Sequence, residues 1–322
     1  ANVRMAQSRY ADAGVLVERA FALEPTFHMK GRLASTLVMR CKYQETLKLV
    51  DEMLVEAPLV ADAVAGIRVE ALTQLGRHDE ALPILDDQLL KRPYEPGLRF
   101  PRATIHLLNE RFEQGWEDYA FRNLSSTKHL RMVAFPQWQG EPLQGKRILV
   151  LAEQGLGDQV MFASCLPDLL AQGPARVVVE VINRVAPTIA RSFPTCEIVP
   201  TKQDVGLEWV RDYTDMDYFI PIGDLPQQFR RSVRDFPRHD GYLRAEPGRV
   251  AHWRDKLAAL GPRAKVGLTW RGGTEKTRTV LRTMRPWQLG ALAKAVEVDW
   301  ICLQYGDVTE GLREAAEVGL TM

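Results

Sequence analysis

A motif that recurs four times at a nearly constant spacing is the feature that most constrains how this 322-residue chain can fold. Its copies open at Tyr10, Tyr43, His78 and Phe112. A proline follows each of the first three openings at the same distance, whereas the fourth copy has Thr127 at that place. A period of roughly 34 residues predicts stacked pairs of helices, because one helix pair cannot bury its apolar face alone.

Each repeat predicts two helices, the second of which ends at the proline, since proline has no amide hydrogen to donate. The unit resembles the tetratricopeptide repeat (TPR). The resemblance implies that small residues such as Ala13 and Ala81 lie where two helices approach closely. The resemblance implies a TPR superhelix over residues 1–128, whose concave face binds a protein or peptide. An unrelated helical bundle is the alternative.

The aromatic residues of the fourth repeat are expected to dock the next domain rather than a peptide: Phe112, Trp116, Tyr119 and Phe121.

The pattern changes after a linker at residues 129–146, which is rich in Pro, Gly and Gln near its end. Short apolar runs then alternate with helical stretches, as is typical of βαβ units and a parallel sheet. Strands are predicted at 147–152, 177–182, 197–200, 217–222, 265–270 and 300–304. Helices are predicted at 158–170, 184–192, 249–260, 287–296 and 310–317. The series divides into one unit over 147–246 and a second over 247–322, which has too few strands for a complete sheet.

A glycine loop between the first predicted strand and its helix carries the candidate catalytic residue. Residues 153–158 read EQGLGD. Gly155 and Gly157 permit a tight turn with positive φ, and Asp158 stands at the helix start, where a carboxylate can cap backbone N–H groups. Ligands of open parallel sheets meet such loops at the carboxyl ends of strands. The third glycine of the dinucleotide fingerprint is absent, which argues against a nicotinamide dehydrogenase.

The surroundings of this loop resemble one protein family. The sequence reads FPQWQGEPLQGKRILV over residues 135–150, then EQGLGD, and then Leu166-Pro167. This arrangement resembles the TPR-linked glycosyltransferases of bacteria, which are similar to heptosyltransferases and O-GlcNAc transferases. The resemblance implies a GT-B module of two Rossmann-like halves, with the acceptor at the first half and the donor at the second. It makes Asp158 the base that takes the proton of the acceptor hydroxyl. The implied acceptor loop comprises Glu153, Gln154, Gly155 and Gly157.

A second glycine loop follows the strand predicted at residues 265–270, where residues 266–274 read VGLTWRGGT. A nucleotide-sugar donor releases a diphosphate, whose charge needs backbone N–H groups and cations. The resemblance assigns the donor to this half of the module. We therefore predict a diphosphate site made of Arg271, Gly272, Gly273, Lys276 and Arg285. A solvated basic loop is the alternative.

Composition and the remaining motifs exclude several other classes. A net charge of +1 gives no electrostatic footprint for nucleic acid, and no apolar run is long enough to span a membrane. The cysteines are far apart, which fits a reducing, cytoplasmic location rather than a disulfide framework or a zinc knuckle. Asp215-Met-Asp217 matches the metal-binding DxD pattern of another glycosyltransferase class. It leads into a predicted strand, so we expect no metal site.

These observations predict a metal-independent glycosyltransferase that needs no cofactor. It would move a sugar from a nucleotide sugar to a hydroxyl, on a protein recruited by the TPR region or on a saccharide. The alternative is a TPR scaffold with an inactive α/β domain, because QVMFASC at residues 159–165 replaces the family's usual Thr-Ile-x-Phe-x-Arg-Tyr. The chain is expected to be a segment of a longer protein, with further donor residues beyond Met322.

Overall fold

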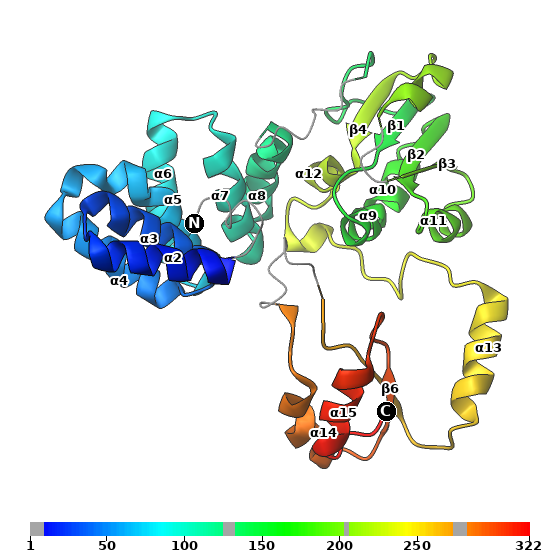
Figure 1. Ribbon diagram of the computed structural model, residues 1–322. Helices are drawn as coiled ribbons and strands as arrows, with labels where there is room; N and C mark the ends of the chain where they lie inside the picture. Colours follow the sequence, from blue (N-terminus) through cyan, green and yellow to red (C-terminus); the bar gives the residue numbers. More distant parts are fainter. Residues whose placement is uncertain (1–9, 125–132, 203–205, 273–281) are drawn as a thin grey trace. The chain divides into compact units, whose positions relative to one another are not determined.

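The computed structural model describes residues 10–124, 133–202, 206–272 and 282–322 (Figure 1). It is rich in helices and contains a small parallel sheet, as a helical region followed by an α/β region requires. The chain divides into two compact units, of which one comprises residues 43–246 and the other residues 1–42 and 247–322. No helix in the described part of the chain is both long enough and apolar enough to cross a membrane.

Helices begin at the four repeat openings and end before the repeat prolines. The helices at these openings are α2 (Tyr10–Leu23), α4 (Tyr43–Glu56), α6 (His78–Lys91) and α8 (Phe112–Tyr119). The helices between them are α3 (Phe27–Met39), α5 (Ala61–Gln74) and α7 (Pro96–Leu108). The first three helices at openings end shortly before Pro25, Pro58 and Pro93, in agreement with the role predicted for proline. Below, α4 to α8 and the turn at Ala120–Leu124 are called the helical arm.

A small buried residue follows each repeat opening by three positions. These residues are Ala13, Thr46, Ala81 and Gly115. A Cβ atom at Gly115 would lie 2.6 Å from Leu107 Cδ2 and 3.2 Å from the Leu107 amide nitrogen. The backbone of α8 therefore packs directly against the Leu107 side chain of α7. Leu90 of α6 is apolar but 85% exposed. It lies beyond the stripe that Leu82, Leu85 and Leu89 bury.

Alanine at Gly115 is expected to destabilise the helical arm, although alanine has the higher helix propensity. The added methyl group must displace Leu107, and such overpacking typically costs about 1–3 kcal/mol. Gly66 in α5 is the matched control, because a Cβ there meets nothing within 4 Å. Gly66→Ala should stabilise the chain by up to about 1 kcal/mol. Urea denaturation of the two variants measures the difference, and equal effects would contradict the close packing of α7 and α8.

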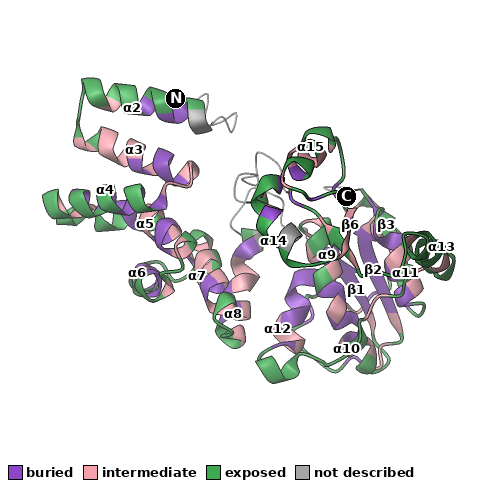
Figure 2. Ribbon diagram, turned by 90° about the horizontal axis from the view of Figure 1, so that it is seen from below, coloured by how far each residue is buried: buried purple, intermediate pink, exposed green. Residues whose placement is uncertain are grey.

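Four parallel strands follow the helical arm. They are β1 (Arg147–Leu151), β2 (Arg176–Ile182), β3 (Glu197–Thr201) and β4 (Tyr218–Pro221), in the order β3-β2-β1-β4. β1 pairs with β2 on one side and with β4 on the other. Both faces of β1 are buried, which explains its continuous apolar sequence, and buried residues run along β1 and β2 in Figure 2.

Short helices follow β1, β2 and β4. They are α9 (Leu156–Phe162), α10 (Leu166–Ala171), α11 (Ala186–Ser192) and α12 (Leu225–Phe229). The single helix predicted at residues 158–170 is in fact two, separated by a short turn at Ala163–Cys165. Pro167 lies in the first turn of α10, where its missing amide hydrogen is tolerated. The break follows from this proline.

Residues 247–322 form a smaller set of elements around a two-stranded parallel sheet. They are α13 (Pro247–Ala258), β5 (Lys265–Leu268), α14 (Gly290–Ala295), β6 (Asp299–Cys302) and α15 (Thr309–Glu317). Trp300 of β6 packs with Ala315 and Leu320 in a small core. This core holds the loops at the carboxyl ends of β5 and β6 in place.

Aromatic residues of α8 attach the helical arm to the four-stranded sheet. The rings of Tyr119 and Phe162 are 6.2 Å apart, and those of Phe112 and Phe236 are 4.7 Å apart. Trp116 Nε1 donates a hydrogen bond of 2.8 Å to the Arg230 carbonyl. The predicted docking role is thereby confirmed for Phe112, Trp116 and Tyr119. For Phe121 it is not: that ring lies under the guanidinium of Arg99, 4.3 Å away, within the arm.

Candidate functional site

The carboxyl ends of β1 and β4 lie side by side at the point where the strand order reverses. Residues 152–158 follow β1, and residues 222–224 follow β4. Open α/β sheets bind their ligands at such a switch point, because the loops there diverge to opposite faces of the sheet. The structure therefore places the predicted acceptor loop at the edge of the sheet where a ligand is expected.

Asp158 is the third residue of α9 and takes part in the N-terminal cap of that helix. Its Oδ2 atom accepts a hydrogen bond of 2.9 Å from the Gly155 amide, and Gly155 is the N-cap of α9. A Cβ atom at Gly155 would lie only 3.2 Å from this oxygen, so the glycine leaves room for the cap. The Asp158 side chain is partly exposed and the adjacent Gly157 is exposed. The carboxylate thus combines a capping role with access from solvent.

The tight turn of this loop falls on Gln154 rather than on the glycines. Gly155 has a φ of −93°, whereas Gln154 has a φ of 59°, a left-handed conformation that is unfavourable for a residue with a Cβ atom. The Gln154 side-chain amide donates a hydrogen bond of 2.6 Å to the hydroxyl of Tyr119 in α8. The prediction of positive φ at Gly155 and Gly157 was wrong because contacts with the helical arm, distant in sequence, fix this turn at Gln154.

A buried guanidinium joins the two loops. Arg122, at the end of the helical arm, is 6% exposed and forms ion pairs with Glu153 after β1 and Asp224 after β4. Its Nη1 atom lies 2.6 Å from Asp224 Oδ1, and its Nε atom lies 3.2 Å from Glu153 Oε2. We call Arg122, Glu153 and Asp224 the Arg122 cluster. Glu153, which was predicted to contact an acceptor, instead points at Arg122 and accepts from the Gly223 amide at 2.7 Å.

Negative charge exceeds positive charge within the Arg122 cluster. Its one guanidinium faces two carboxylates, and the Gln137 amide donates to Asp224 Oδ2 at 2.9 Å. Burial raises the pKa of Asp224, and the neighbouring Glu153 raises it further against the opposite effect of Arg122. Burial lowers the pKa of Arg122, but the two carboxylates outweigh it, so that the net shift is upward and the guanidinium stays charged. The cluster therefore depends on Arg122.

Residues 159–165, which differ from the pattern of the glycosyltransferases that the preceding loop resembles, have structural partners of their own. Gln159 is buried, and its Oε1 atom accepts a hydrogen bond of 2.8 Å from the Ile182 amide at the end of β2. Ser164 stands where the resembled glycosyltransferases have arginine. Its carbonyl accepts a hydrogen bond of 3.2 Å from Arg230, whose guanidinium is also 2.6 Å from Asp168. Arg230 thus connects the end of α12 to the turn before α10 and to α10 itself.

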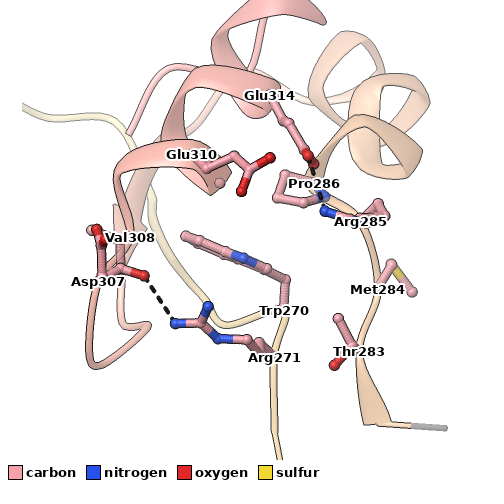
Figure 3. Close-up of a pocket in the computed structure, with 11 residues that line it drawn as sticks. Trp270, Arg271, Thr283, Met284, Arg285, Pro286, Asp307, Val308, Glu310 and Glu314 are labelled. Carbon is pink, nitrogen blue, oxygen red and sulfur yellow. Dashed lines mark hydrogen bonds and ion pairs between the residues drawn. The ribbon is translucent and has the colours of Figure 1, made fainter. Parts of the chain in front are cut away.

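The carboxyl ends of β5 and β6 border a pocket of about 160 Å³. Figure 3 shows the indole of Trp270 inside it, with Arg271 on one side and Glu310 on the other. The lining residues are Trp270, Arg271, Thr283, Met284, Arg285, Pro286, Asp307, Val308, Glu310, Gly311 and Glu314. Arg271 Nη2 donates to the Asp307 carbonyl at 2.9 Å, and Arg285 Nη1 lies 3.1 Å from Glu314 Oε1.

The structure brings two of the predicted diphosphate residues together. Arg271 and Arg285 line the same pocket, whereas Gly272 lies next to it and donates to the Arg282 carbonyl at 3.0 Å. Gly273 and Lys276 lie outside the described residues. Buried Gln304 holds this loop, because its Oε1 atom accepts from the amides of Trp270 and Arg271 at 3.1 and 2.8 Å.

Sequence reasoning missed the acidic side of this pocket. Glu310 and Glu314 lie one helical turn apart on α15, which places them on one face of the helix. The spacing of Glu310 and Glu314 in the sequence was the signal that could have identified an acidic face on this helix. Within the described part of the chain, no hydrogen-bond partner reaches the buried atoms Glu314 Oε2 and Thr283 Oγ1. The pocket thus offers both cations and carboxylate oxygens to a ligand.

The Asp215-Met-Asp217 triplet lies near the amino end of β1, at the opposite edge from the Asp158 loop. Asp217 Oδ2 accepts from the Arg147 amide at 2.8 Å, and Asp215 forms ion pairs with Arg147 and Arg176 at 3.0 and 3.4 Å. These carboxylates connect the starts of β1 and β2. The structure thus gives both of them a role in holding the sheet.

The chain was compared with families and with curated proteins. No family model matches it. It is 33% identical to Protein FlbA of Caulobacter vibrioides over an alignment of 284 residues that covers 83% of the chain. The chain spans about half of the length of that relative, 47%.

Proposed function

We propose that the chain is part of a TPR-linked glycosyltransferase, with TPR repeats in its helical region and a GT-B module after them. The observation that carries the proposal is the position of the EQGLGD loop, at the carboxyl end of β1 where the order β3-β2-β1-β4 reverses. Rossmann-like folds bind ligands at this point, and the loop there carries a solvent-accessible carboxylate. Its similarity to Protein FlbA brings no activity with it, since that name states none.

In this proposal Asp158 takes a proton from the acceptor hydroxyl as the hydroxyl oxygen attacks the anomeric carbon. The bond from that carbon to the diphosphate oxygen breaks, and the nucleoside diphosphate leaves with the electron pair. A carboxylate suits this step because general bases must be ionised and within reach of the proton. The hydrogen bond from Gly155 holds Asp158 Oδ2 and so orients the carboxyl group.

The donor is proposed to bind in the pocket at the carboxyl ends of β5 and β6. Arg271 and Arg285 provide cations for the diphosphate, which gains charge as the sugar departs. Glu314 is suited to a hydroxyl group of the ribose or sugar, because its buried Oε2 atom needs a donor, and the exposed Glu310 lines the same pocket. The acceptor is proposed to be a protein or peptide that the TPR region recruits, with a saccharide as the other candidate.

A nucleoside diphosphate is expected to raise the melting temperature of the full-length protein. A ligand at 100 times its Kd stabilises the native state by about 2.7 kcal/mol, which corresponds to a rise of several degrees. Thermal-shift titration with UDP, GDP, ADP and CMP, and with their sugar conjugates, measures the effect. Arg271→Gln should weaken the shift. Arg254→Gln on α13, where the side chain is 72% exposed, is the matched control and should leave the shift unchanged.

The second candidate is a TPR scaffold with an inactive α/β domain. It is favoured by the structural use of Gln159 and Ser164, at positions where the family pattern differs. A well-folded full-length protein that responds to none of these nucleotides would support the scaffold and contradict the transferase.

A further inference from the structure

We propose that Arg122 is a positioning residue for the Asp158 loop, so that the helical arm completes the candidate acceptor site. This inference rests on the proposed function. The loop sequence suggests that its glycines and the start of α9 shape it. The structure shows instead that the loop is held from outside, by a side chain 31 residues earlier in the chain.

The guanidinium makes contacts that depend on its forked shape. Two of its nitrogens, Nε and Nη2, face the two oxygens of Glu153, while Nη1 faces Asp224. Nη1 also donates to the Tyr119 carbonyl at 3.0 Å, which ties the fork to the arm itself. Lysine carries the same charge as a single point and cannot span both carboxylates in this geometry. Arg122 therefore fixes the spacing between the loops after β1 and β4, beyond neutralising them.

The contact with Glu153 continues along the backbone to Asp158. Gln154 is next in the chain, has the left-handed φ of 59°, and is held by the Tyr119 hydroxyl. The amide of Gly155 then donates to Asp158 Oδ2. Two residues of the helical arm thus hold the two residues before the N-cap: Arg122 binds Glu153, and Tyr119 binds Gln154. Release of Glu153 would free the left-handed turn to relax, and the amide that orients Asp158 would move with it.

Gly223 lies in close contact with both Arg122 and Glu153. A Cβ atom there would lie 2.8 Å from Arg122 Nη2 and would also collide with the Glu153 carboxylate. The glycine lets the β4 loop approach near enough for its amide to donate to Glu153 at 2.7 Å. Both loops and the end of the arm therefore meet at one buried point.

The test compares Arg122→Lys with Arg230→Lys in the full-length protein. Arg230 is the matched control, because it is also buried, at 3% exposure, and pairs with Asp168 away from the loop. Hydrogen exchange of the backbone amides at residues 152–158 is measured by mass spectrometry. Arg122→Lys is expected to speed exchange there about tenfold or more relative to wild type and to Arg230→Lys, because the lysine cannot hold both loops. Exchange in β2 and β3 should be unchanged.

A kinetic measurement then separates positioning from stability. Arg122→Lys should lower kcat about tenfold or more and leave the KM for the nucleotide sugar within about twofold, since the donor pocket lies in other elements. Arg230→Lys should leave kcat unchanged. Tyr119→Phe gives a second variant with an intact ring, in case Arg122→Lys does not fold. It removes the hydroxyl that holds Gln154 and should also speed loop exchange.

Loop exchange that is the same in Arg122→Lys and Arg230→Lys would overturn the inference, as would unchanged loop exchange in Tyr119→Phe if only that variant can be studied. Equal losses of kcat in the two arginine variants would also overturn it. A wild-type protein without transferase activity contradicts the proposed function and, with it, the catalytic purpose of the positioning. In that case the exchange comparison, which needs no substrate, still decides whether Arg122 holds the loop.

Discussion

Replacement of Arg122 by methionine is expected to lower the free energy of unfolding by about 3–5 kcal/mol, the typical effect of removing one partner from a buried ion pair. Methionine fills much of the space but leaves Glu153 and Asp224 facing each other without the guanidinium. Guanidinium denaturation, followed by tryptophan fluorescence, measures the loss. The matched control is Arg231→Met, because Arg231 also pairs with a residue of the arm, Glu113, but both side chains are more than half exposed. Its effect should stay below about 1 kcal/mol.

The loss at Arg122 is expected to depend on pH. Burial already raises the pKa of Asp224, and removal of the cation raises it further. A carboxyl group whose pKa is higher in the folded state than in the unfolded state, where it is near 4, contributes to stability when it is protonated. This contribution is fully present at pH values below the unfolded-state pKa. This contribution is lost as pH rises through the folded-state pKa. Arg122→Met should therefore be closest to wild type near pH 5 and furthest from it near pH 8. A loss that is the same at both pH values would contradict the buried charge imbalance.

Replacement of Asp158 by asparagine is expected to reduce the transfer rate about 10²- to 10⁴-fold, the range typical for loss of a general base. Asparagine keeps an oxygen that can accept from the Gly155 amide, so the helix cap and the stability should change little. The affinity for the nucleotide should also be unchanged, because the donor pocket lies in other elements. The initial rate of nucleoside diphosphate release, in the presence of acceptor, measures the effect.

The control for Asp158→Asn is a second aspartate with the same local geometry. Asp235 Oδ2 accepts from the Ser232 amide at 2.7 Å, as Asp158 does from Gly155, but it caps a short turn away from the loops after β1 and β4. Asp235→Asn should leave the rate at the wild-type value. A rate that survives in Asp158→Asn as well would show that Asp158 is only a cap and would remove its catalytic role.

Local features of the fold could be predicted because their causes are local in sequence. The repeat prolines end α2, α4 and α6, and the apolar run of β1 reports burial on both faces of a parallel sheet. Pro167 indicates the break between α9 and α10, but the prediction of a single helix over residues 158–170 did not include it. The strand order β3-β2-β1-β4 could not be predicted from the sequence, because the sequence of one strand does not specify which strands pair with it.

The candidate site was predictable only in part, for a similar reason. The position of Asp158 after a strand and two glycines is a local pattern, and so is Arg271 after β5. Arg122 stands where the helical period fades, and its partners Glu153 and Asp224 are 31 and 102 residues away. The left-handed turn at Gln154 depends on the same distant contacts. Pairings of this kind appear only when the chain is folded.

The strand order also sets a sequence of events for a chain that is still being synthesised. β1 can pair with β2 soon after it emerges, since Arg147 lies opposite Arg176. Its other edge must wait for β4, because Ile148 lies opposite Tyr218, which is made only after β2 and β3. Until then a strand with Leu149 and Leu151 on one face presents unpaired amides and carbonyls, a surface that recruits other chains into aggregates. A chain that ended before residue 218 would thus carry a folded arm next to a sheet with an unpaired edge, which is prone to aggregate.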